Sequence, residues 1–309
     1  MFSLYLNVFK PAGDISDVPV LVFIHGGSLT TGQSSFSEYR GEDLAKQGIV
    51  FVSITYRLGV FGYYANEQLR EIPAEQLVKT QHENSAMTVD GYAIAEQPYL
   101  TYEKGNNNET ALLNGFNAHE ADVFNFMQKV EQADYAEALQ KLFPAGNAAD
   151  EALKQFPYDS KQQEYALAVD MGGEAKGTYN YVLSGAWFAY SHYRWSEYMA
   201  GQEKPVYLYC FTKNNRSLRA YHGGEMPYAY GNLWRHAWLY DESDMALSET
   251  MQHYWVNFVK SGNPNGEGLP AWEQYSRGKV LELGENVAMS QDMYNDLYPM
   301  IDDYQNAAE

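Results

Sequence analysis

The chain has 309 residues, which is enough for one large α/β domain or two small ones. Its formal net charge of -19, from 21 basic and 40 acidic residues, argues against nucleic acid and against an anionic membrane as partners, because both require clustered lysine and arginine. No stretch approaches 18 consecutive apolar residues, and the beginning MFSLYLNVF has no basic region before a long apolar run. We therefore expect no membrane span, no signal peptide and a cytoplasmic location.

The first part of the chain alternates predicted strands with a predicted helix. Apolar alternation predicts a strand at residues 4–9, and a continuous apolar run predicts a strand buried on both faces at 19–24. Residues 37–47 have a helical pattern that ends at Gly48. A second buried strand is predicted at 49–56. This strand–helix–strand order predicts that the two buried strands are parallel.

The rest of the chain continues the alternation. Short strands are predicted at 111–116 and 205–211, and the residues between them have a mostly helical pattern. Cys210, in the second of these strands, is the only cysteine, so no intramolecular disulfide is possible. Residues 244–260 repeat apolar side chains at spacings of three and four, as in an amphipathic helix. We predict an α/β fold with a mostly parallel sheet, in a single domain spanning 1–309.

A glycine pair follows the predicted strand at 19–24. In the sequence His25-Gly26-Gly27, the absence of Cβ atoms allows two backbone N–H groups to turn toward a developing oxyanion. A simple glycine turn that ends a strand explains the same residues, and for three residues in isolation it is the commoner explanation. The pair is therefore a candidate oxyanion loop only in the company of other signals.

A carboxylate and an imidazole follow two later strands. Glu120 comes just after the strand at 111–116, where it could orient a catalytic histidine, but Asn117 and Glu120 also have the spacing of a helix capping box. His222 lies about ten residues after the strand at 205–211 and is a candidate general base, although a lone surface histidine is commoner. His222 and Glu225 could form a pair of metal ligands, but no third ligand is clustered with them, so we predict neither a metal nor a cofactor.

The order of these signals resembles the type-B carboxylesterases of the α/β-hydrolase fold, which include bacterial para-nitrobenzyl esterases and cholinesterases. The matching stretches follow the family's order: LYLNVFKP at 4–11, PVLVFIHGGSLTTGQSS at 19–35, TYRLGVFGYYANEQL at 55–69, TVDGY at 88–92, GFNAHEADVF at 115–124, HGGEMPYAYGN at 222–232 and YWVNFVKSGNPNG at 254–266. By this resemblance, Gly26 and Gly27 supply oxyanion-hole amides, Glu120 is the acidic member of the triad and His222 is the general base. The implied substrate is a small uncharged carboxylic ester.

The family's nucleophile is missing, because no G-x-S-x-G motif occurs in the sequence. In relatives, a block of roughly a hundred residues carries a G-E-S-A-G strand-to-helix turn between the stretches that match 55–69 and 70–77 here. In this chain Leu69 runs directly into Arg70, so the comparison places an excision near 67–71. The portion that precedes LYLNVF in relatives is also missing. The resemblance thus implies an incomplete sheet that lacks the nucleophile strand and its successor.

The missing serine has a chemical consequence and a structural one. His222 has no elbow serine to activate, and neither Ser28 nor Ser53 lies on a strand-to-helix elbow. Loss of a triad nucleophile lowers kcat by about 10⁶-fold. The absent strands also leave two sheet edges, which either close on each other or find another chain, so self-association through exposed edges is expected.

Two hypotheses follow. The first is a carboxylesterase by descent, with a Ser-Glu-His mechanism in its relatives, that is inactive or nearly so. The second is a non-catalytic α/β-hydrolase-like binding protein, or the product of a deleted gene. Covalent labelling of a serine by a fluorophosphonate separates active from inactive chains.

Overall fold

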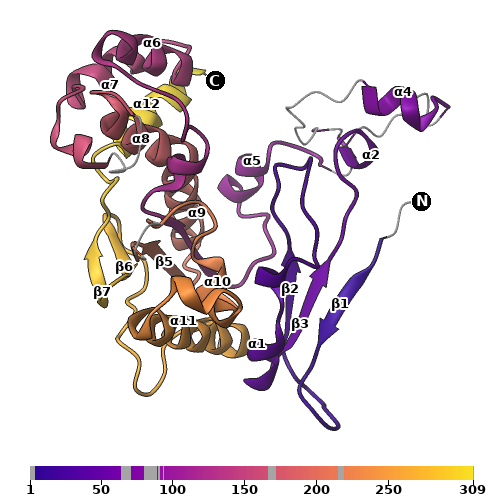
Figure 1. Ribbon diagram of the computed structural model, residues 1–309. Helices are drawn as coiled ribbons and strands as arrows, with labels where there is room; N and C mark the ends of the chain where they lie inside the picture. Colours follow the sequence, from indigo (N-terminus) through magenta and orange to yellow (C-terminus); the bar gives the residue numbers. More distant parts are fainter. Residues whose placement is uncertain are drawn as a thin grey trace.

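The computed structural model describes residues 4–63, 71–79, 89, 91–92, 94–165, 172–214 and 219–308, and it contains two sheets (Figure 1). The first sheet has the order β1-β3-β2 and the second has the order β4-β5-β6-β7. Their strands are β1 (Leu6–Phe9), β2 (Val20–Ile24), β3 (Val50–Ile54), β4 (Leu112–Asn117), β5 (Val206–Phe211), β6 (Lys279–Leu283) and β7 (Val287–Gln291).

Three of the five strand pairings in the two sheets are parallel. β2 pairs with β3 in parallel, as the strand–helix–strand order predicts, and β4 pairs with β5 and β5 with β6 in the same way. The outer strands β1 and β7 are antiparallel to their neighbours. The α/β class and a mostly parallel arrangement are therefore confirmed, in the form of two mixed sheets rather than one.

The helices lie around the second sheet and at the ends of the first. They are α1 (Glu42–Lys46), α2 (Val60–Tyr63), α4 (Ala74–Lys79), α5 (Pro98–Glu103), α6 (Gln132–Leu142), α7 (Ala148–Gln155), α8 (Lys176–Ser184), α9 (Tyr190–Gly201), α10 (Met226–Ala229), α11 (Glu242–Ser261) and α12 (Tyr298–Ala308). Shorter helical turns are η1 (Ser37–Tyr39), η2 (Glu120–Val123), η3 (Lys161–Tyr165), η4 (Gly185–Ala189) and η5 (Leu233–Leu239). None of the described helices is both long and apolar enough to cross a membrane.

The predicted helix at 37–47 is divided into η1 and α1, which corrects the sequence prediction. The break falls at Gly41, where a Cβ atom would lie 2.3 Å from ring atoms of Phe51. Close packing of the chain against β3 therefore interrupts the helix. The predicted end at Gly48 is confirmed, because this residue has a left-handed φ of 86° that favours glycine.

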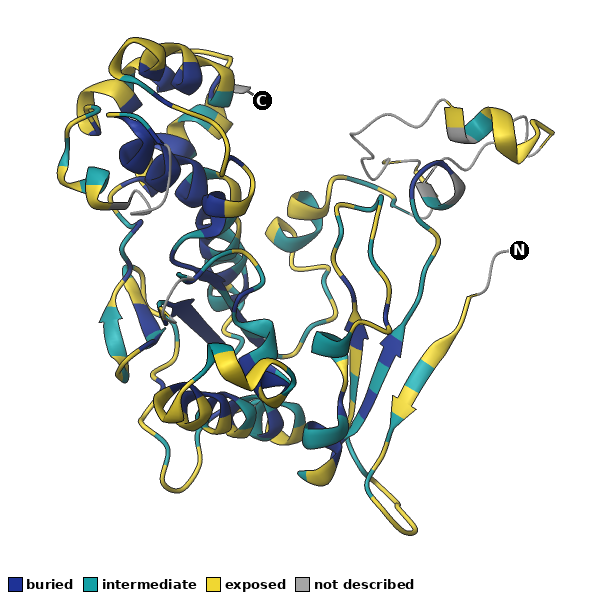
Figure 2. Ribbon diagram, in the orientation of Figure 1, coloured by how far each residue is buried: buried dark blue, intermediate teal, exposed yellow. Residues whose placement is uncertain are grey.

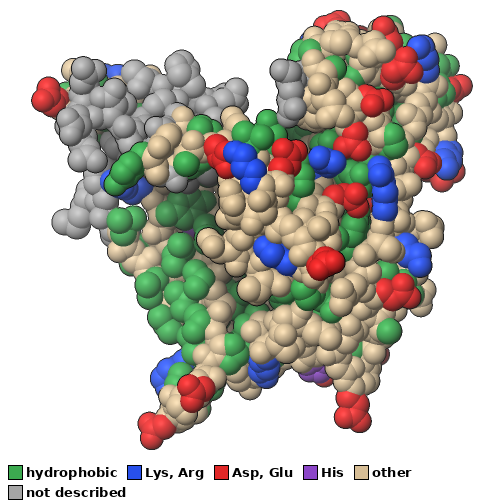
Figure 3. Space-filling view, turned by 180° about the vertical axis from the view of Figure 1, so that it is seen from behind, with side chains coloured by type: hydrophobic (Ala, Val, Ile, Leu, Met, Phe, Trp, Pro, Cys, Tyr) green, Lys and Arg blue, Asp and Glu red, His purple; other side chains and the backbone are tan. Residues whose placement is uncertain are grey.

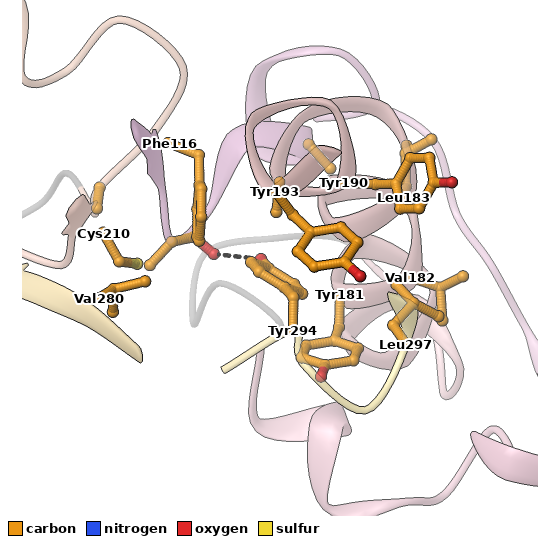
Figure 4. Close-up of a cluster of buried hydrophobic side chains, with 14 of the residues drawn as sticks. Phe116, Tyr181, Val182, Leu183, Tyr190, Tyr193, Cys210, Val280, Tyr294 and Leu297 are labelled. Carbon is orange, nitrogen blue, oxygen red and sulfur yellow. Dashed lines mark hydrogen bonds between the residues drawn. The ribbon is translucent and has the colours of Figure 1, made fainter. Parts of the chain in front are cut away.

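The larger core lies on the second sheet and is rich in tyrosine (Figure 2). Tyr294 is completely buried, and its hydroxyl donates a hydrogen bond to the carbonyl of Ala118 at 2.8 Å (Figure 4). Its ring also packs against Phe116 and Tyr181, with centroids 5.7 and 4.9 Å away. All six residues of β5 are buried, five of them in this core and Val206 in a small cluster with Leu112 and Met199.

The first sheet is covered on one face only. The predictions of strands buried on both faces at 19–24 and 49–56 are wrong, because burial alternates along β3 and three of the five residues of β2 are exposed. The covered face has a small core formed by Phe23, Phe51 and neighbours. The opposite face has no helix packed on it among the described elements.

Helix α11 connects the two sheets, because it runs below the second sheet toward α1 and the lower end of β2 (Figure 1). Its Val256 belongs to the small core with Phe23 and Phe51, whereas its Tyr254 belongs to the large core. Further along the helix, Lys260 Nζ donates to the carbonyl of Gln47 at 2.8 Å. Because one rigid helix contacts both cores, the loops at the ends of β2 and β5 are held in a common frame.

The facing edges of the two sheets do not close on each other. Among the described residues, β2 pairs only with β3, and β4 pairs only with β5. Of the two outcomes expected for a sheet that lacks its central strands, direct closure is therefore not the one observed. The proposed junction near 67–71 falls almost entirely outside the described residues.

Candidate active site

The carboxylate and the imidazole predicted from the sequence lie in direct contact. Glu120 Oε2 and His222 Nδ1 are 2.6 Å apart. Glu120 begins η2, directly after β4, and His222 lies in the loop between β5 and α10. The parallel pairing of β4 and β5 continues beyond the strands through a bridge between His119 and Tyr221. This extension places the next residue of each segment, Glu120 and His222, beside each other.

Glu120 orients the imidazole, whereas the capping-box interpretation is wrong, because the N-cap of η2 is His119 and no side chain caps this helix. Glu120 Oε1 accepts a hydrogen bond from the backbone N–H of Asn117 at 2.8 Å, as the glutamate of a capping box does. Its other oxygen binds His222. The side chain of Asn117 does not complete the box, because its Nδ2 donates to the Tyr221 carbonyl and to Glu225. One carboxylate thus ends the strand and also orients the imidazole.

The environment of His222 favours its protonated form. The hydrogen bond to Glu120 raises the pKa of His222, and this effect outweighs the opposing effect of burial. The rings of Phe124 and Phe188 stack on each other with centroids 5.4 Å apart, and both contact the imidazole, with centroids 5.1 and 4.9 Å from it. The side chain is about half exposed, at 47%, so the imidazole is open to a cavity.

Glu225 is a site residue that the sequence analysis considered only as a metal ligand. Burial raises the pKa of this carboxyl to about 7, and the charge of Glu120 adds to the shift. Its contact with Asn117 links it to the backbone that positions Glu120. The signal in the sequence was its position one helical turn after His222. Within the described residues, no group of three or more His, Cys, Asp or Glu is arranged to hold a metal ion.

The glycine loop after β2 has a backbone that requires glycine. Gly27 has a φ of 126°, and a Cβ atom there would lie 2.1 Å from the carbonyl oxygen of Thr31. The loop turns tightly after Gly27, because the N–H groups of Thr30 and Thr31 both donate to the Gly27 carbonyl at 3.0 Å. Tyr56 fixes the start of the loop by donating from its hydroxyl to the His25 carbonyl at 2.5 Å.

One cavity brings the glycine loop and the imidazole together. It has a volume of about 620 Å³, and its lining includes Gly26, Gly27, Phe124 and His222. Glu38 is the only charged side chain in the described lining besides the imidazole. The two loops come from different sheets, so the cavity depends on the frame that α11 provides. With one acidic side chain and one imidazole, the described walls carry no excess of either charge, which suits an uncharged ligand.

No serine in the described part of the chain is hydrogen-bonded to His222. Ser28 lines the cavity and has a left-handed φ of 52°, but it belongs to the glycine loop and not to a strand-to-helix turn. Ser53 is completely buried in β3, where its hydroxyl donates to the Ser34 carbonyl at 3.3 Å. Neither serine has the arrangement of a triad nucleophile.

A sequence profile described as the carboxylesterase family matches the chain in two segments, residues 3–73 and 64–300. Para-nitrobenzyl esterase from Bacillus subtilis (strain 168) is 25% identical over 404 positions, covering 94% of this chain and 80% of the relative. Pyrethroid hydrolase Ces2e from Rattus norvegicus is 42% identical over 77 residues, covering 22% of this chain. The match spans only 14% of that relative's length, so the chain aligns with a small part of it.

Solved structures share the fold over nearly the whole chain. The carboxylesterase EST55 of Geobacillus stearothermophilus superposes with a TM-score of 0.80 and 20% identity, covering 96% of this chain and 85% of the other. A structure described as PNB esterase gives a TM-score of 0.77 with 19% identity and covers 96% and 84%. These similarities show an α/β-hydrolase esterase fold.

Proposed function

Because the chain belongs to the carboxylesterase family, we propose that it keeps the family's ester-binding cavity but does not turn esters over at the family's rate. The observation that carries the proposal is the contact of Glu120 with His222 beside a glycine loop, in a sequence without a G-x-S-x-G motif. The ligand class is a small uncharged carboxylic ester.

The acid–base pair supports an inherited acyl-transfer site. Since Nδ1 of His222 is engaged by Glu120, Nε2 is the nitrogen left to exchange a proton with a ligand in the cavity. The backbone N–H groups of Gly26 and Gly27 come from the loop that lines the same cavity. Two amide donors of this kind stabilise an oxyanion most effectively in a water-poor site.

The missing nucleophile sets the limit on activity. In triad enzymes the loss of the serine lowers kcat by about 10⁶-fold, while binding and the oxyanion donors leave a small residual rate. The alignment with para-nitrobenzyl esterase supports a missing block: of its 404 positions, this chain supplies about 290, which is 94% of 309 residues. The profile match, which restarts at residue 64 after reaching 73, supports a discontinuity in the same region.

A fluorophosphonate probe tests the proposal. We expect no serine of the purified chain to be labelled, and hydrolysis of p-nitrophenyl butyrate to be about 10⁶-fold slower than that of an intact family esterase. His222→Ala should leave this residual rate unchanged within about twofold, because in triad enzymes loss of the serine alone costs about as much as loss of all three triad residues. Labelling of any serine, together with hydrolysis that His222→Ala abolishes, would contradict the proposal. Ser28→Ala then identifies whether the cavity serine is responsible.

A further inference from the structure

The two sheets face each other across an open slot bounded by the edges of β2 and β4, which pair with no further strand in the part of the chain that the structure describes. A cavity of about 410 Å³ opens there, and its lining includes Val20 and Leu21 from β2, Leu113 from β4, and Trp255 and Phe258 from α11. Helix α11 therefore forms the floor of the slot. Apolar side chains line it on both sides.

The backbone of β2 offers a regular row of hydrogen-bonding groups to this slot. The Pro19 carbonyl accepts from the Val50 N–H at 2.9 Å, so the groups of Pro19 point toward β3. Because successive residues of a strand direct their backbone groups to opposite sides, the N–H and C=O groups of Val20, Val22 and Ile24 point into the slot. Unpaired groups of this kind are a template for another strand.

The uncovered face of the first sheet adds an apolar surface to this edge. The strand register places Val22 beside Val52 and Val52 beside Val8, so these side chains share one face. Val22 and Val8 are each 54% exposed. Hydrophobic side chains gather over this sheet in the space-filling view (Figure 3). Soluble chains rarely expose a continuous apolar surface of this kind unless it binds something.

The position of the two sheets indicates what fits the slot. A TM-score of 0.80 over 96% of this chain means that both sheets superpose together on an uninterrupted esterase. The sheets thus keep the separation that they have when further residues stand between them. More than 100 positions of the para-nitrobenzyl esterase alignment have no residue of this chain, which is enough for two strands with their helices.

We propose that the slot binds a second polypeptide, a carboxylesterase-family segment that supplies two parallel strands and the G-x-S-x-G turn, so that two chains together form one esterase site. The proposal rests on the proposed function. A strand that pairs with β2 in parallel ends at the same edge of the sheet as β2. The serine that follows it would therefore enter beside Gly26 and Gly27, in the cavity that His222 lines.

The chemistry of such a complex needs no further reactant. The serine hydroxyl adds to the ester carbonyl while its proton passes to Nε2 of His222, and collapse of the adduct releases the alcohol with that proton. An acyl group remains bonded to the serine. Water then attacks this acyl-serine through the same proton transfers, which releases the carboxylic acid and restores the hydroxyl.

The test has two stages: a family segment is first joined to this chain (in cis), and the segment that restores activity is then supplied as a separate polypeptide (in trans). Family segments are inserted between residues 63 and 71 of this chain, and one that restores p-nitrophenyl butyrate hydrolysis is expressed as a separate polypeptide with the unaltered chain. We expect the two to copurify at equal stoichiometry, with hydrolysis at least about 10³-fold above that of the chain alone. A segment that is active in cis but does not bind in trans overturns the proposal, as does the failure of every segment in cis.

A matched pair of variants tests the edge itself. Val22→Pro removes an N–H that points into the slot. Val8→Pro removes an N–H on the outer edge of β1. The Tyr5 carbonyl accepts from Thr55, so in an alternating strand the backbone groups of Val8 point away from β3. Both valines are equally exposed, so the pair controls for loss of apolar surface. We expect Val22→Pro to weaken capture of the segment by at least about tenfold, and Val8→Pro to leave it unchanged.

If the two variants capture the segment equally well, pairing at β2 is overturned. It is also overturned if both lose capture equally while their circular dichroism spectra stay unchanged. If the unaltered chain forms its own dimer and excludes the segment, the slot takes a second copy and the proposal fails. Fluorophosphonate labelling of the chain alone would contradict the proposed function without affecting capture of the segment, so the two failures are distinguishable.

Discussion

The β4–β7 sheet and the β1–β3–β2 sheet belong to one family fold but differ in how well they are enclosed. All of β5 is buried, whereas β2 has Phe23 as its single buried residue. The acid–base pair follows strands of the enclosed sheet, and its geometry is complete. The glycine loop follows a strand of the open sheet. The site therefore combines an acid–base pair on the enclosed sheet with a glycine loop on a more exposed sheet.

Truncation in the enclosed core should give the largest loss of stability. Tyr294→Ala removes a buried ring and the hydrogen bond to the Ala118 carbonyl, so we expect the free energy of unfolding to fall by about 3–5 kcal/mol. Tyr294→Phe keeps the ring and should cost about 1 kcal/mol. Urea denaturation followed by circular dichroism measures both. A loss below about 1 kcal/mol for Tyr294→Ala would show that this core is not packed as described.

The partly buried carboxyl of Glu225 should make stability depend on pH. Its pKa is raised from 4.5 to about 7, so the folded state holds this proton in a range where the unfolded state has lost it. Stability from this group therefore falls as pH rises from about 4.5 to about 7 and is constant above that range. Glu225→Gln stays neutral and should gain about 2–3 kcal/mol relative to the parent chain across this window. Parallel pH profiles of unfolding would contradict the assignment.

Much of the site's frame was predictable from local pattern, because strands with long apolar runs are recognisable from sequence. The strands at 19–24, 111–116 and 205–211 agree with β2, β4 and β5 to within about one residue at each end. The roles of Glu120 and His222 came from family order, since a cap and a surface histidine explained each of them locally. Their contact depends on a bridge between residues about 100 positions apart in sequence, which no local pattern encodes.

The remaining features depend on tertiary contacts. The break at Gly41 arises from a contact with Phe51 in a neighbouring strand, and an apolar run does not reveal that one face of β2 is exposed. That the two sheets stay apart follows from α11, whose Val256 holds the first sheet from below. That a helix contacts two cores cannot be predicted from its own apolar pattern, because the positions of both cores must be known.

The Glu120–His222 contact should give a smaller, pH-dependent effect. The pKa of His222 is raised in the folded chain, so its stabilising contribution is fully present below the unfolded value of about 6.5 and is lost as pH rises through the folded value. Glu120→Gln should lower the pKa of His222 and cost about 1 kcal/mol at low pH, because the half-exposed imidazole is partly screened. Titration of the imidazole protons by NMR measures the shift. An unchanged pKa would show that the contact does not persist in solution.

The smallest effect on stability is expected on the open face of the first sheet. This effect tests directly whether the two sheets differ in how well they are enclosed. Val22 is 54% exposed on β2, and Val22→Lys places a charge where solvent already is. The free energy of unfolding should therefore change by no more than about 0.5 kcal/mol. Urea denaturation followed by circular dichroism measures this change. A loss above about 2 kcal/mol would mean that something covers this face in solution, because only a buried valine responds so strongly to a charge. In that case the two sheets would be equally enclosed, and the slot would already be filled.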